Sequence, residues 1–176
     1  MAEEKELVTT AVKDKYTTGT KAFPPKLAQL SPGDKVIDSS DPKTSTVTDM
    51  DRWAASIQEY LQRAKNYLAH NDTMQASEKL FKATEESIKF LTVFNKLDEY
   101  EEARKSGEWW LRLLSRASDT LAHKKKKKFI SEAWQQAYLA HRFGFHENDY
   151  SKEKVEEVIP VVEKLVDYVQ EVQNAR

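Results

Sequence analysis

Apolar residues recur with the period of an α-helix through most of the chain beyond residue 48. They form one helical stripe over residues 53–68, and a second stripe follows over residues 76–94. Asp72 or Thr73 is expected to cap the second helix, because short polar side chains accept hydrogen bonds from the first free N–H groups of a helix. The connection between the two stripes is short, so the pattern predicts an antiparallel helical hairpin.

The second of these helices is expected to have one buried face and one solvated face. Its inward positions include small residues, which predict close packing against the first helix. Its charged residues are expected to point outward, and these are Glu78, Lys82, Glu85, Glu86 and Lys89.

The middle of the chain predicts two further helices after a charged segment. Residues 96–106 are expected to form a short helix or a loop, and Gly107 is expected to open the next helix. Trp110 falls on the apolar stripe of that helix and is predicted to be a core residue, whereas Trp109 is predicted to be a partly buried neighbour or an interface residue. Another helix is expected from Phe129 onward and fades near Gly144.

The last helix is expected to start at a Ser151 cap and to carry a valine-rich stripe over residues 155–172. Valine suits strands, but the helical period decides here because it persists through the whole segment. Pro160 lies on the polar side of this stripe and is predicted to bend the helix, since proline removes one backbone hydrogen bond.

Glycine and proline are concentrated before residue 48, and only Gly107, Gly144 and Pro160 lie beyond it. A sheet protein needs frequent turns, so this scarcity predicts an all-α fold, an antiparallel up-and-down bundle of about five helices. Residues 1–48 are polar and cannot bury enough apolar surface to fold alone, so they are predicted to be a disordered or weakly docked tail. Residues 49–176 form the predicted bundle domain.

Composition excludes several classes of function. The chain of 176 residues has no cysteine, which excludes a disulfide scaffold and thiolate chemistry. Its N-terminus is acidic, and it has neither a signal-peptide stretch nor an apolar run long enough for a membrane span, so a cytoplasmic location is expected. The four histidines show no metal-ligand spacing, and the glycines form no phosphate-binding loop, so we expect no metal and no cofactor.

Positive charge is concentrated in one part of a nearly neutral chain. Residues 104–146 contain ten basic and three acidic residues, a net charge of +7, although the whole chain has a net charge of −1. Concentrated positive charge suits a polyanion. The candidate phosphate-binding residues are Arg112, Arg116, Lys124, Lys125, Lys126, Lys127 and Lys128. The alternative is that the lysine run is a solvated turn, since it lacks interleaved aromatic residues.

Arg142 and His146 are the candidate catalytic pair. They are four residues apart, so they would share one face if an α-helix continues through Gly144. A histidine can take the 2′-hydroxyl proton of RNA or protonate the leaving oxygen, while an arginine holds the phosphate. The alternative is that Gly144 caps the helix, and then both residues have structural roles.

Several of these residues carry a resemblance to a known family. Ala76, Leu80 and Ala83, the segment Ala-His-Arg-Phe-Gly-Phe-His-Glu at 140–147 and the terminal valine-rich helix resemble the archaeal PaREP family, small helical proteins similar in fold to the HEPN (higher eukaryote and prokaryote nucleotide-binding) superfamily. The resemblance implies an up-and-down bundle that is commonly a homodimer. Active ribonucleases of that superfamily carry an Arg followed by a His in a cleft between two protomers, and Arg142 and His146 are the matching positions. Three residues separate them, one fewer than in the shortest form of that motif.

Three functions therefore stand as predictions. The first is a HEPN-like domain that binds a nucleotide or a nucleic acid such as RNA without catalysis, and the resemblance adds a nucleotidyltransferase as a possible partner protein. The second is a helical protein-interaction module that uses the valine face of residues 155–172 or the edge at Trp109 and Trp110. The third is a metal-independent ribonuclease of toxin type that uses Arg142 and His146.

Overall fold

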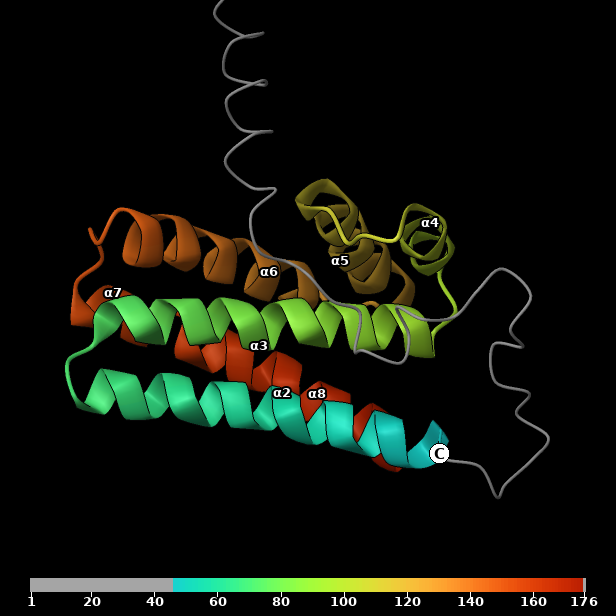
Figure 1. Ribbon diagram of the computed structural model, residues 1–176, viewed down its shortest axis with the longest axis horizontal. Helices are drawn as coiled ribbons and strands as arrows, with labels where there is room; N and C mark the ends of the chain where they lie inside the picture. Colours follow the sequence, from blue (N-terminus) through green and yellow to red (C-terminus); the bar gives the residue numbers. More distant parts are fainter. Residues whose placement is uncertain (1–45, 176) are drawn as a thin grey trace, which may run out of the picture.

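The computed structural model describes residues 46–175, and every regular element in this range is a helix (Figure 1). The elements in chain order are α2 (Thr46–Ala69), α3 (Thr73–Phe94), α4 (Asp98–Ser106), α5 (Leu111–Lys125), α6 (Phe129–Leu139), the π-helix η1 (Ala140–His146), α7 (Lys152–Glu156) and α8 (Ile159–Asn174). The predicted all-α bundle is confirmed. The predicted tail, apart from the three residues with which α2 begins, lies outside the described residues.

The first two helices form the predicted antiparallel hairpin. Asn71 takes a left-handed conformation in the turn, with φ of 59°, and Asp72 caps α3 by accepting a hydrogen bond at Oδ1 from the N–H of Gln75 at 3.0 Å. The cap satisfies one of the free N–H groups with which a helix begins. α2 and α3 pack along their full length as a result (Figure 1).

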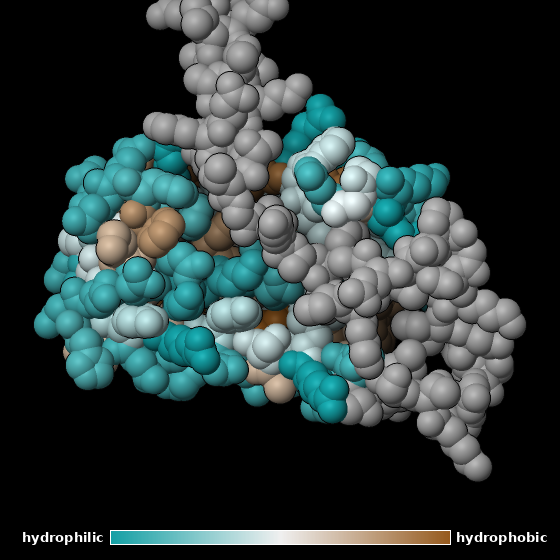
Figure 2. Space-filling view, in the orientation of Figure 1, coloured by the Kyte–Doolittle hydropathy of each residue, from teal (hydrophilic) through white to brown (hydrophobic). Residues whose placement is uncertain are grey.

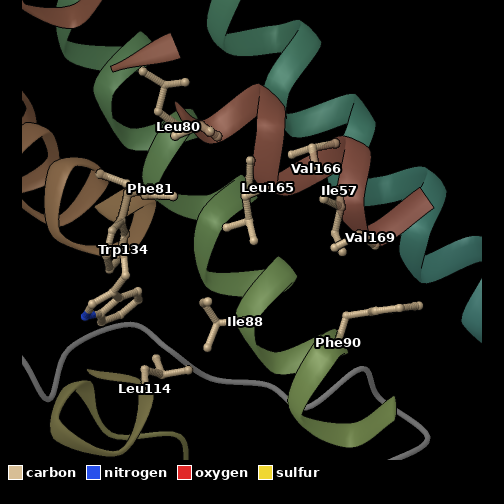
Figure 3. Close-up of a cluster of buried hydrophobic side chains, with 14 of the residues drawn as sticks. Ile57, Leu80, Phe81, Ile88, Phe90, Leu114, Trp134, Leu165, Val166 and Val169 are labelled. Atoms are coloured by element: carbon tan, nitrogen blue, oxygen red, sulfur yellow. The ribbon is translucent and has the colours of Figure 1, made fainter. Parts of the chain in front are cut away.

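Helix α3 is the centre of the bundle. Figure 1 shows it crossing the middle of the molecule, with α2 and α8 on one side and α4, α5 and α6 on the other, and every other described element contacts it. The buried side chains meet around this helix in Figure 3, where Leu80 and Ile88 of α3 face Leu165 of α8 and Leu114 of α5. The hydrophobic core is therefore organised around one buried helix.

Two predictions for the middle of the chain are wrong. Gly107 ends α4 instead of opening the next helix: it is left-handed, with φ of 76°, and its N–H donates to the carbonyl of Ala103 at 2.9 Å. Helix α5 then begins at Leu111, so the two tryptophans precede it. Trp109 is the core residue at 3% exposure, and Trp110 is 44% exposed. The helical period assigned Trp110 to the core because the helix was expected to begin at Gly107, four residues before its observed start at Leu111.

The valine-rich segment forms two helices where one was predicted. Ser151 caps α7 as expected, accepting a hydrogen bond from the N–H of Lys154, but α7 ends at Glu156. Pro160 lies in the first turn of α8, where a missing N–H costs nothing, so it opens a new helix instead of bending a continuous one. The valine stripe is buried in the bundle, including Val155 and Val162 at 0% exposure, and is not available as the contact surface of an interaction module.

Candidate functional site

The segment that carries Arg142 and His146 is a π-helix that continues directly from α6. Its backbone hydrogen bonds link residues five apart, as in the N–H of Glu147 to the carbonyl of Arg142 at 3.3 Å. Side chains five apart consequently meet. Nε of Arg142 donates to Oε1 of Glu147 at 2.7 Å, and Nε2 of His146 lies 3.0 Å from Nε2 of His141. The α-helical spacing that would pair Arg142 with His146 does not apply here.

Gly144 lies inside this π-helix, so the alternative prediction that it caps the helix is wrong. The left-handed residue is Asn148, with φ of 51°. Gly144 is buried against α3, and a Cβ at this position would lie 2.2 Å from Oγ of Ser77 and 2.8 Å from its Cβ. Because no side chain fits there, Gly144 allows η1 to approach α3 closely.

His141 lies between two aromatic rings at this junction. Its imidazole stacks on Phe81 of α3, with ring centroids 4.3 Å apart, and on Phe145 of η1, with centroids 5.3 Å apart. Burial of the ring, and after it the neighbouring His146, lower the pKa of His141 to about 4, although Glu78 and Glu85 act in the opposite direction. His141 is therefore neutral at pH 7, which is the form of the ring that accepts a proton.

A cluster of buried charges lies next to this junction on α3, and the sequence did not predict it. Glu85 and Lys89 are each 1% exposed, and Nζ of Lys89 lies 2.6 Å from Oε1 of Glu85. Glu86 accepts a hydrogen bond from the indole Nε1 of Trp53 at 2.8 Å. Burial alone would raise the pKa of Glu85, but the ammonium groups of Lys89 and Lys82 outweigh it and hold this pKa below its usual value.

The outward orientation expected for these charged residues is thus wrong for Glu85, Glu86 and Lys89. The expectation assumed that α3 has one free face, whereas helices surround it. One signal was present: Glu85 and Lys89 are four residues apart, the spacing of an intrahelical ion pair, which lets both charges be buried together.

The predicted phosphate-binding residues separate into two groups along α5. Arg116, on the second turn, is bound by Glu102 of α4, and its Nε lies 3.4 Å from Oε1 of Glu99. Arg112 is exposed on the first turn. Lys124 follows Arg116 by eight positions, or about 12 Å of helix. The arginines are consequently not part of one patch with the lysines.

Lys124–Lys128, here named the lysine turn, form the end of α5 and the connection to α6. Lys126 ends α5 in a left-handed conformation, with φ of 54°, and Lys124, Lys125, Lys126 and Lys128 are exposed. Within the described range, no ion pair is formed by any of the five. The lysine turn is about 20 Å from Arg142 along α6 and η1, so these two predicted sites are separate.

Aromatic rings that are distant in the sequence lie beside the lysine turn. Nζ of Lys127 lies 4.8 Å from the ring centroid of Tyr168 on α8 and 5.6 Å from that of Phe129. Nζ of Lys164, also on α8, lies 4.8 Å from the ring centroid of Phe129. Sequence reasoning missed Lys164 and Tyr168, because nothing local links them to a lysine run about 40 residues earlier.

Residues 46–175 contain no group of three or more His, Asp or Glu side chains placed to hold a metal ion. None of the helices in this range is both long enough and apolar enough to cross a bilayer.

The lowered pKa of His141 predicts a specific loss of stability in acid. His141 takes up a proton at about pH 4 in the folded chain and at about pH 6.5 in the unfolded chain, so the unfolded state binds more protons between these values. The free energy of unfolding should therefore fall as the pH drops from 7 to 5. Allowing for solvent around the half-buried ring, we expect His141 to contribute about 1 kcal/mol of this loss.

Urea unfolding at both pH values measures this contribution as a difference between variants. The His141→Phe variant keeps a flat ring over Phe81 and should lack this part of the loss, whereas the exposed His123→Gln control should match the parent protein. Equal losses in the parent and in His141→Phe would contradict the assignment, as would an NMR titration of His141 near pH 6.5.

Comparison with known proteins identifies the family. The model of the archaeal PaREP1/PaREP8 family matches residues 53–166. The crystal structure of a Sulfolobus solfataricus protein is similar, with a TM-score of 0.61 and 31% identity, over 66% of this chain and 95% of that one. A solution structure of the same target gives a TM-score of 0.60 and 31% identity, over 66% and 90% of the two chains. The comparison with curated proteins found no match. The chain belongs to the archaeal PaREP1/PaREP8 family.

Proposed function

We propose that this protein binds nucleic acid through the lysine turn. One observation carries the proposal: five consecutive lysines lie at the end of α5 and in its connection to α6, four of them exposed, and within the described range none is neutralised by an acidic side chain. Binding to a phosphate backbone depends on such uncompensated charge, because each contact releases counterions from the nucleic acid.

Three of the five other basic residues in the segment of residues 104–146 support this location. Arg104 is paired with Glu101, Arg116 with Glu102, and Arg142 with Glu147. Pairing within the protein removes most of the field that these arginines would present to a ligand. The uncompensated positive charge of the segment is therefore concentrated at the lysine turn.

Removing the exposed lysines should weaken binding in a salt-dependent way. The variant with Lys124, Lys125, Lys126 and Lys128 changed to Gln should bind RNA at least about tenfold more weakly near 0.1 M salt. The slope of the logarithm of the association constant against the logarithm of salt concentration should fall by roughly 0.7 for each lost phosphate contact with a single strand. Fluorescence anisotropy of a labelled oligonucleotide at several salt concentrations measures both quantities.

A charge-matched control separates this site from net charge. Changing Lys65, Lys105, Lys152 and Lys154 to Gln removes the same charge from other surfaces of the bundle and should leave both affinity and slope near those of the parent. Equal binding by the two quadruple variants would contradict the proposal.

A second candidate function is metal-independent RNA cleavage at η1, which the contact between His141 and His146 favours. In such a reaction one group removes the proton of the 2′-hydroxyl, the oxygen attacks the phosphorus, and a second group protonates the leaving 5′-oxygen. The two imidazoles supply two groups within reach of each other, and the neutral ring of His141 can accept a proton. Arg142 would have to exchange its ion pair with Glu147 for the phosphate.

Cleavage is tested directly with single-stranded RNA in the presence of EDTA. If η1 is catalytic, the parent protein should cleave the RNA, and His146→Ala should slow the reaction by about 10²- to 10⁴-fold. The His123→Ala control, on an exposed residue of α5, should cleave at the parent rate. Intact RNA after incubation with the parent protein would rule out this candidate.

We also propose that the protein is a HEPN-like homodimer in the cytoplasm. Its candidate partner protein is a nucleotidyltransferase, and its candidate small ligand is a free nucleotide. Figure 2 shows a hydrophobic patch on a mostly hydrophilic face, where α6 leads into η1. Leu139, the last residue of α6, is 42% exposed. A second copy that covered Leu139 would lie beside Arg142 and His146, the arrangement that the family resemblance implies.

For the interaction-module alternative, Trp110 is the exposed residue of its predicted edge.

A further inference from the structure

We infer that the lysine turn takes single-stranded nucleic acid and that the ring of Tyr168 is a stacking surface for one base. This inference rests on the proposed function and names its substrate class. Protein sites that bind single-stranded nucleic acid without sequence preference combine positive charges along the phosphate backbone with an aromatic ring on which a base stacks. The fold brings these two components together from separate parts of the chain.

The position of Lys127 shows that the ring of Tyr168 can be reached from the lysine turn. Its Nζ lies 4.8 Å from the ring centroid, the distance at which a cation rests on an aromatic face. A base could take this place while the lysine moves to a phosphate, because the lysine stem is flexible and the ammonium is strongly hydrated.

The ring itself is held by two helices. Tyr168 belongs to α8 and meets Phe129, the first residue of α6, edge to face with ring centroids 5.9 Å apart. A ring fixed in this way loses little freedom when a base stacks on it, which favours binding. Burial, and after it Glu171, raise the pKa of Tyr168, so the phenol stays neutral beside a phosphate chain.

Ammonium groups from two elements meet at these rings. Lys127 comes from the lysine turn and Lys164 from α8, and both lie over Phe129. A strand whose base stacks on Tyr168 therefore has cations available from the lysine turn and from α8. A duplex cannot use the ring in this way, because its bases are already stacked inside the helix and double-stranded RNA is recognised across a longer surface.

The test uses three oligonucleotides of equal length with the wild-type chain: single-stranded oligouridylate, a duplex RNA, and an abasic single strand that keeps every phosphate. We expect oligouridylate to bind about tenfold more tightly than the abasic strand, the effect of one stacked base, and more tightly than the duplex. Equal affinities for oligouridylate and the abasic strand would overturn the inference, as would tighter binding of the duplex.

Variants locate the stacked base at Tyr168. Tyr168→Leu should remove the tenfold preference for oligouridylate over the abasic strand, and Tyr168→Phe, which keeps the ring, should retain it. Heparin, a polyanion without bases, separates the two proposals. We expect the parent and Tyr168→Leu to bind heparin equally well. If the protein binds heparin but does not prefer oligouridylate to the abasic strand, only the stacking inference is overturned. Absence of binding to heparin and to every oligonucleotide would overturn the proposed function as well.

Discussion

The rest of the structure depends on the burial of α3, whose residues 83–92 are all buried, and on the close approach of η1 to it at Gly144. Every other described element contacts α3, so from Ala83 to Thr92 the helix has no solvated side. Close approach requires small residues at the contact. Gly144 on η1 and Ser77 on α3 meet where a single Cβ would not fit. Protein interiors are packed too densely to absorb an added methyl group without a shift.

This constraint explains the polar chemistry inside the bundle. A charged residue on a surrounded helix must find its partner on the same helix or on a packed neighbour, since an unpaired buried charge is very costly. Lys89 meets Glu85 within α3, and Glu86 meets the indole of Trp53 on α2. Hydroxyl groups of α3 are satisfied by carbonyls one turn earlier, as in Thr84 to Leu80 at 2.9 Å. The central helix is therefore polar and yet fully buried along much of its length. Helix α6, which packs on α3, has the lysine turn at its N-terminal end and η1 at its C-terminal end.

The sequence predicted most of the fold but little of the site geometry. Helical periods, the hairpin and the caps at Asp72 and Ser151 follow from local patterns, which explains why the structure confirms them. A period shows which residues of a helix are apolar, but it does not show how many neighbours surround the helix. The burial of Glu85 and Lys89 was missed for that reason. The π-helix was missed because a local pattern does not show how closely this segment packs against α3, and the approach of Tyr168 to the lysine turn depends on the packing of α8 against α6.

The exchange of Gly144 for Ala tests the central contact most directly. A close contact with α3 and an ordinary helical environment predict changes of opposite sign in the free energy of unfolding. In an ordinary helix the exchange stabilises by up to about 1 kcal/mol. Here the added methyl group meets Ser77, so Gly144→Ala should lower the free energy of unfolding in urea by about 1–3 kcal/mol. In a double-mutant cycle, Ser77→Gly should make the exchange less costly, because it removes both atoms that the new Cβ would meet. A Gly144→Ala variant as stable as the parent or more stable, with no coupling to Ser77, would contradict the account.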